Sequence, residues 1–128
     1  SNAQLTVEDI IKSRQALFSK NYSTAKRVQA FSSKGDFEKA KKLTLEMSKN
    51  YKVLIDLFPE NTQEGFDTGA LLTIWDEKDE FNALMAKASD DMIKLTSVIE
   101  DAEDIRGTLK KFMWSNCKAC HSRYREPH

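Results

Sequence analysis

Both cysteines of the chain lie close to its C-terminal end, in the segment Cys117-Lys118-Ala119-Cys120-His121. A Cys-x-x-Cys-His segment is the pattern of covalent attachment of a c-type haem. Residues three and four positions apart share one face of a helix, so both thiols can reach the two vinyl groups of one porphyrin. His121 then lies below the centre of the ring, where an imidazole serves as the proximal iron ligand. The spacing therefore predicts one covalently bound haem c.

Three other kinds of site use the same residue types. A thioredoxin-like redox pair needs a βαβ context. A structural zinc site needs four ligands, whereas the chain has two cysteines and two histidines, one of them the terminal His128. A plain disulfide leaves the adjacent His121 unexplained, although two cysteines without haem would be expected to pair in an oxidising compartment. These alternatives stay open, and the pattern favours haem.

The composition favours long helices as the elements that position this segment. The 128 residues are 31% charged and include only four Gly and two Pro, whereas globular chains average about 25% charged residues, 7% Gly and 5% Pro. Lys+Arg and Asp+Glu are equal at 20 each, so global charge predicts neither a nucleic-acid nor a membrane partner. No apolar run approaches the ~20 residues of a membrane span. Residues 1–3 look like an expression-tag remnant, which leaves 4–128 as one domain.

Apolar residues recur at steps of three and four in four stretches, which predicts four amphipathic helices. Thr6 followed by Asp9 is typical of a helix start, Asp36 can cap a second helix, and Pro59 ends it. The expected spans are about 6–31, 36–58, 78–100 and 102–124. The longest connector, about 59–69, is expected to cross one end of the domain. These elements predict an all-α fold, an antiparallel four-helix bundle with a covalently attached haem.

The C-terminal segment Cys-Lys-Ala-Cys-His-Ser-Arg-Tyr-Arg resembles that of the cytochromes c′, class II c-type cytochromes whose haem lies inside a four-helix bundle. The similarity extends over essentially the whole chain. It includes Ser13-Arg14-Gln15-Ala16, Leu57-Phe58-Pro59-Glu60, Asp67-Thr68-Gly69-Ala70-Leu71 and Ile74-Trp75. A haem motif near the C-terminus distinguishes this class from class I cytochromes c, in which the motif lies near the N-terminus.

The resemblance implies which residues lie at the haem edge. Arg14 is expected to contact a haem propionate, with Gln15 beside it. An arginine on an otherwise apolar helix face needs an anionic partner, and a carboxylate can accept two hydrogen bonds from it. Asp67 and Thr68, in the connector, are expected near the haem as well.

The resemblance also implies the two axial sides of the iron. Phe18 is expected on the distal side, and because it has no donor atom the iron is predicted to be five-coordinate and high-spin, with His121 as its one axial protein ligand. Arg125 matches a basic residue beside that histidine. It could tune the iron or meet a gas that displaces His121, or it could simply complement the helix dipole.

Two functions follow as hypotheses. The first is a periplasmic haem protein that binds nitric oxide or CO and takes part in electron transfer with a redox partner. The second is a low-spin, six-coordinate class II cytochrome acting as an electron carrier, with a ligand from Met47, Met85, Met92 or Met113. An enzyme is disfavoured because no second internal histidine is present for distal acid–base work. Family members often form homodimers, whereas the charged outward positions of the first two helices also suit a monomer.

Overall fold

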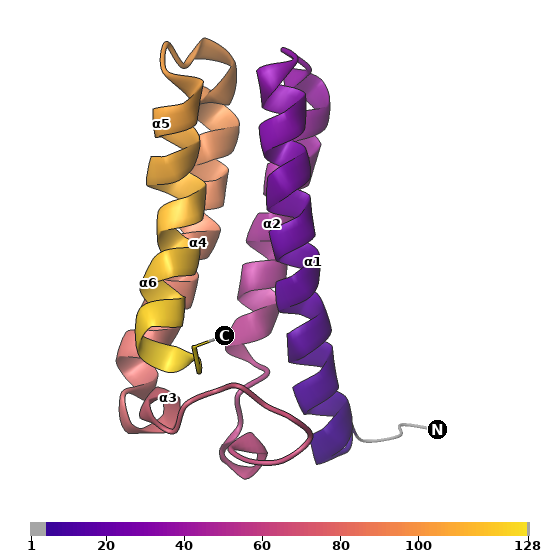
Figure 1. Cartoon of the computed structure of the whole chain (residues 1–128), viewed down its shortest axis with the longest axis vertical. Helices are drawn as coiled ribbons and strands as arrows, with labels where there is room; N and C mark the ends of the chain where they lie inside the picture. The colour runs from indigo at the N-terminus through magenta and orange to yellow at the C-terminus, as the bar shows by residue number, and fades with distance from the viewer. Residues whose placement is uncertain (1–4, 128) are drawn as a thin grey trace.

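The structure, a computed structural model, describes residues 5–127; the expected tag remnant at 1–3 lies outside them. Four long helical segments pack as an antiparallel bundle, which confirms the predicted all-α fold (Figure 1). They are α1 (Val7–Ser33), α2 (Phe37–Ile55), α4 (Lys78–Val98) and a fourth segment built from α5 (Ile105–Leu109), η3 (Lys110–Trp114) and α6 (Ser115–Tyr124). Among the described residues, none of the helices is both long and apolar enough to span a membrane.

Short polar side chains fix where the helices begin. Thr6 and Asp9 form a reciprocal capping box at the start of α1, and Asp36 accepts a hydrogen bond from the Lys39 amide at the start of α2. Asp104 caps α5 in the same way. The fourth segment therefore begins at Ile105, slightly later than expected, because the turn η2 (Ile99–Asp101) follows α4.

The connector between α2 and α4 crosses the end of the bundle at which the chain also terminates (Figure 1). It contains two short helices that the hydrophobic pattern did not predict, η1 (Glu60–Thr62) and α3 (Thr73–Asp76). Beyond α6 the chain pairs with this connector. The Leu71 amide donates to the Tyr124 carbonyl (2.9 Å), and the Glu126 amide donates to the Gly69 carbonyl (2.8 Å). The connector is thereby held against the end of the helix that carries both cysteines.

The fourth segment contains one widened turn, because η3 is a π-helix. The Ser115 amide donates to the Lys110 carbonyl, five residues back instead of four. The Asn116 side chain donates to the Phe112 carbonyl at 3.1 Å and supports this turn. Such π-turns occur frequently at functional sites, and this one ends three positions before Cys117.

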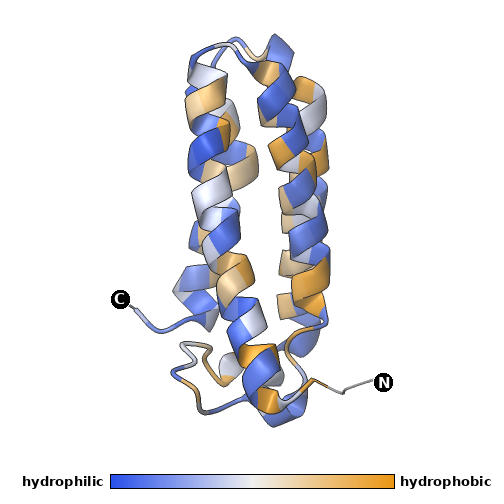
Figure 2. Cartoon of the chain, turned by 90° about the vertical axis from the view of Figure 1, so that its right-hand side faces the viewer, coloured by the Kyte–Doolittle hydropathy of each residue, from blue (hydrophilic) through white to orange (hydrophobic). Residues whose placement is uncertain are grey.

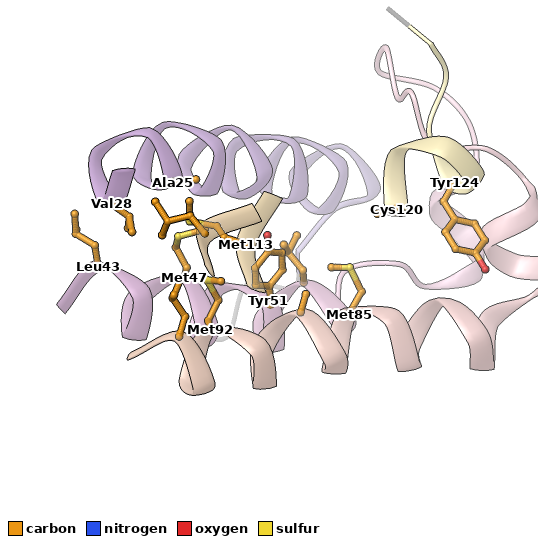
Figure 3. Close-up of a cluster of buried hydrophobic side chains, with 14 of the residues drawn as sticks. Ala25, Val28, Leu43, Met47, Tyr51, Met85, Met92, Met113, Cys120 and Tyr124 are labelled. Atoms are coloured by element: carbon orange, nitrogen blue, oxygen red, sulfur yellow. The ribbon is translucent and has the colours of Figure 1, made fainter. Parts of the chain in front are cut away.

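The core follows the predicted stripes. Figure 2 shows apolar and polar residues alternating around the helices, and Figure 3 shows how the buried side chains of α1, α2, α4 and the fourth segment meet. The fully buried residues include Ile11, Val28, Met47, Leu54, Met92, Leu95 and Met113. Tyr22 of α1 is 49% exposed. Its ring meets Trp114 edge to face, with 6.1 Å between the ring centroids, and so links α1 to η3.

Candidate functional site

A cavity of about 1030 Å³ lies between α1, α2, α4, the connector and α6. Every residue that the sequence assigned to the site lines it. They are Arg14, Gln15, Phe18, Asp67, Thr68, Cys117, Cys120, His121 and Arg125. The fold thus brings together residues from three distant parts of the chain.

Both cysteines present their thiols to this cavity and neither forms a disulfide. Burial raises the pKa of Cys120 to about 11 and also raises the pKa of Cys117. Both thiols are therefore protonated at neutral pH. Tyr51 of α2, which is buried, places its hydroxyl 3.9 Å from the Cys117 sulfur. Burial and the neighbouring thiol raise the pKa of Tyr51, so it stays a neutral phenol.

His121 lies one residue beyond Cys120, at the exposed margin of the cavity. The Arg125 guanidinium approaches its ring, with Nη1 3.2 Å from Nδ1 and 2.9 Å from Nε2. Binding of a metal through either ring nitrogen would replace one of these contacts. Arg125 is thus beside the histidine, as the resemblance implied.

Arg14 is 2% exposed and donates to four acceptors at the connector end of the bundle. Nη1 donates to the Leu57 carbonyl (3.1 Å) and the Thr62 hydroxyl (2.7 Å), and Nη2 donates to the Thr62 carbonyl (2.8 Å) and the Thr68 hydroxyl (3.0 Å). Its guanidinium carbon also lies 4.5 Å from the centroid of the Phe58 ring. These acceptors are neutral, whereas the sequence argument called for an anion. Burial lowers the pKa of Arg14 to about 10.

Gln15, the next residue, holds the connector. Its side-chain amide donates to the carbonyls of Asp67 (3.2 Å) and Phe66 (3.5 Å). Both connector residues have left-handed backbone angles, φ 59° and φ 52°, which are costly for residues other than glycine. The contacts of Arg14 and Gln15 therefore bind one strained stretch of chain to α1 at the edge of the cavity.

Aromatic rings form the apolar wall of the cavity. Phe18 meets Phe58 edge to face at 6.3 Å between ring centroids, Phe58 meets Phe81 at 4.7 Å, and Phe81 meets Tyr124 at 5.2 Å. All four line the cavity. Phe18 is half-buried, in keeping with a ring that borders an open space.

Several polar residues of the cavity lining were not predicted as part of the site, among them the buried Asn21, Tyr51 and Asn116. Each lies on a helix stripe that otherwise packs the core, and each is at most 5% exposed. Asn21 accepts a hydrogen bond from Asn50 at 2.9 Å. A polar residue on an apolar stripe was the one signal that could have pointed to them.

Asn116 also belongs to a buried polar cluster behind the cysteines. The Asp91 carboxylate, in a residue that is 5% exposed, accepts from Lys87 Nζ (2.6 Å) and from Asn116 Nδ2 (2.9 Å). Burial raises the pKa of Asp91, but the hydrogen bonds from Lys87 and Asn116 outweigh this effect, and the net pKa lies below the ordinary 3.8. The cluster ties α4 to the residue before Cys117.

We expect Asp91→Asn to destabilise the protein by about 2 kcal/mol at pH 7, because a charged hydrogen-bond acceptor is lost from a buried site. A carboxyl group whose pKa is lowered by folding contributes stability above its unfolded pKa and loses it as the pH falls through its folded pKa. The difference between wild type and variant should therefore be constant above about pH 5 and shrink as the pH falls below about 4. Guanidinium unfolding at several pH values measures this. Asp90→Asn, one position away and exposed, is the control; an equal effect of both variants would contradict the role of the cluster.

The lining of the cavity fits a haem. Two thiols and an imidazole at i, i+3 and i+4 lie on one wall, and aromatic rings line much of the rest. A buried cation with neutral partners lies at the edge, where a carboxylate would offset the cost of its burial. Cys117, Cys120 and His121 would hold the group, and Arg14 is placed for its acidic substituents.

A four-helix bundle with a Cys-x-x-Cys-His segment facing an internal cavity defines a class of helical c-type haem proteins. The family model described as Cytochrome C' matches residues 9–125. The chain therefore belongs to the cytochrome c′ family, a family of haem proteins that are not enzymes.

Individual relatives agree with this assignment. Cytochrome c′ of Rhodopseudomonas palustris is 28% identical over 120 residues, which cover 91% of this chain and 82% of the relative. A solved structure of cytochrome c′ from Rhodopseudomonas palustris superimposes with a TM-score of 0.76 at 27% identity, covering 93% of this chain and 97% of the other. The nitric oxide complex of a point mutant of cytochrome c prime from Alcaligenes xylosoxidans shares the fold, with a TM-score of 0.80 at 23% identity, covering 98% of this chain and 100% of the other.

Proposed function

We propose that residues 4–128 act as one domain that carries a single haem c, bound through thioethers to Cys117 and Cys120, with His121 as the proximal iron ligand. The observation that carries the proposal is that both thiols and the imidazole line the same cavity as Phe18. The family assignment supports the cofactor. When bound, the haem supplies an iron that binds a diatomic gas and exchanges one electron.

The residues at the cavity edge orient the group. We infer that Arg14 binds a propionate and that Gln15, Asp67 and Thr68 shape the edge around it. Arg14 is already fixed by four hydrogen bonds, so little side-chain entropy is lost when a carboxylate arrives. A carboxylate at this position raises the pKa of Arg14 back towards its ordinary value, because an opposite charge favours the charged form.

We propose that the side of the cavity lined by Phe18 is where nitric oxide or CO binds, to a five-coordinate, high-spin iron. A phenyl ring has no donor atom and occupies the space that water would need. A bulky apolar wall favours small neutral ligands. The nitric oxide complex of the Alcaligenes xylosoxidans variant shows a relative binding this gas. Arg125, beside His121, would influence the opposite side.

The alternative is a low-spin electron carrier with a methionine ligand. Of the four methionines, Met85 lines the cavity, whereas Met47, Met92 and Met113 are buried among core residues. Met85 of α4 lines this cavity together with Tyr51 and Cys120, and Figure 3 labels all three. Met85 is therefore the donor to test for this alternative.

Absorption and resonance Raman spectra of the matured protein, ferric and ferrous, with and without nitric oxide, test the proposal. We expect the spectra to show high-spin, five-coordinate markers, and the ferrous spectrum to change when nitric oxide is added. Met85→Leu should show the same markers and the same change. A sulfur-to-iron charge-transfer band that disappears in Met85→Leu would establish the alternative instead. A ferrous spectrum that nitric oxide leaves unchanged would contradict gas binding.

We propose a periplasmic location, because covalent haem attachment in bacteria takes place outside the cytoplasmic membrane. We also propose that the protein exchanges electrons with a redox partner and forms a homodimer through α1 and α2. Such a redox partner needs a surface close to the haem cavity, because electrons must pass between the two centres.

A further inference from the structure

The neutral total charge conceals a strong asymmetry along the chain. Between Ile105 and Arg125 there are six cations and no carboxylate. The six are Arg106, Lys110, Lys111, Lys118, Arg123 and Arg125. Arg123 forms ion pairs with Glu77 and Glu80, whereas within residues 5–127 no ion pair holds the other five. The helical segment that carries the haem motif therefore gives one face of the molecule a positive charge, although the total charge of the chain is zero.

An open groove of about 380 Å³ runs along the outer side of this helix. We call it the lysine groove; its lining residues are Lys110, Trp114, Ser115, Lys118, Ala119 and Ser122. The two lysines lie about two helical turns apart, and Trp114, Ala119 and the two serines lie between and beyond them. The lysine groove can therefore receive an apolar side chain of a partner while its two cations pair with carboxylates around it.

The lysine groove adjoins the haem cavity. Trp114 and Lys118 line both. Trp114 is fixed there because its indole donates to the Gln29 side chain at 2.8 Å and its ring packs on Tyr22. Lys26 lies over the Tyr22 ring at 4.3 Å and extends the positive charge onto α1, across the mouth of the cavity. A protein seated in the groove would therefore lie directly beside the haem.

We propose that the lysine groove docks the acidic surface of an electron-transfer protein. This rests on the proposed haem function and names the partner chemistry for it. One electron passes from the reduced centre of the partner to the ferric haem, and no bond forms or breaks. Trp114 is half-buried and Tyr22 is exposed, and lysines surround both. Aromatic residues surrounded by charged side chains are typical of protein interfaces. Lys110 and Lys118 attract carboxylates on the surface of a partner protein, and this attraction accelerates the association of the two proteins.

The test is the rate of reduction of the matured protein by a reduced plant-type [2Fe–2S] ferredoxin, an acidic protein donor at about −400 mV. Each rate is divided by the rate with reduced riboflavin, a small reductant that needs no protein docking surface, so that any change at the haem itself cancels. We expect Lys110→Glu/Lys118→Glu to lower this ratio at least tenfold at low ionic strength, and high salt to remove the difference. Lys110→Glu alone, outside the cavity, should give an intermediate ratio.

Lys34→Glu/Lys94→Glu, on exposed positions in the turn after α1 and on α4, makes the same change in total charge and is the matched control. An unchanged ratio in this control supports docking at the lysine groove. An equal fall in both double variants, or no fall in either, would overturn the proposal. The proposed haem function fails separately, if nitric oxide leaves the ferrous spectrum of the wild type unchanged.

Discussion

Replacement of both Cys117 and Cys120 by alanine is expected to abolish retention of haem on the denatured polypeptide. Both thiols line one wall of the cavity, at the spacing that reaches one porphyrin. Without them, haem would be held through His121 and apolar contacts alone. Its binding would then be reversible, and the stability of the protein would depend on the concentration of free haem. Haem staining of a denaturing gel should show a band for the wild type and none for the double variant.

Single variants sharpen this result. Cys117→Ala and Cys120→Ala should each keep a stained band, because one thioether suffices for retention. Ser115→Ala/Ser122→Ala is the control, since both serines are exposed on the same helix. Haem that stays with the denatured double variant would refute attachment through these cysteines.

Arg14→Met is expected to destabilise the haem-loaded protein by about 3 kcal/mol. The change leaves the carbonyls and hydroxyls of Leu57, Thr62 and Thr68 short of a donor, and an unsatisfied buried polar group costs about 1–3 kcal/mol. For a chain of this size the loss corresponds to a fall in Tm of roughly 10 °C. Limited proteolysis should also cleave the connector around Phe66 faster, because its support from α1 is weakened.

Two further variants separate charge from geometry. Arg14→Lys keeps the charge but loses the planar fork of donors, so its stability should fall between those of wild type and Arg14→Met. Arg27→Met removes an exposed arginine of the same helix and should change stability by less than about 0.5 kcal/mol. If Arg14→Met were no less stable than Arg27→Met, Arg14 would not be what holds the connector.

The bundle was predictable because its signals are local. Thr6 and Asp36 marked helix starts, and the apolar stripes marked the buried faces, as the structure confirms. The predicted end of the second helix at Pro59 was wrong by about one turn, because α2 ends at Ile55, and Asp56 and Leu57 already form a turn before the proline. The short helix α3 was missed because four residues carry no periodicity. The π-turn was missed because a widened turn leaves the pattern of apolar residues almost unchanged.

The partners of the site residues were less predictable than the residues themselves. Spacing placed Cys117, Cys120 and His121 on one face, and the resemblance added the rest. The four neutral acceptors of Arg14 depend on where the connector returns to α1, which is a long-range property. Tyr51 looked like ordinary core, because nothing in α2 indicates that the neighbour of its hydroxyl is a thiol.

The π-turn of η3 makes the length of the chain, and not only its composition, a constraint on haem attachment. Each residue of a helix turns the following residues by about 100°. Because the widened turn takes up one extra residue, deletion of one residue from the segment Lys110–Trp114 would restore a regular helix and leave the direction of both thiols nearly unchanged, whereas insertion of one further residue would swing them by about a quarter-turn away from the cavity. The widened turn thus sets the angular phase of the haem motif relative to the core, and insertions here would be far less tolerated than substitutions.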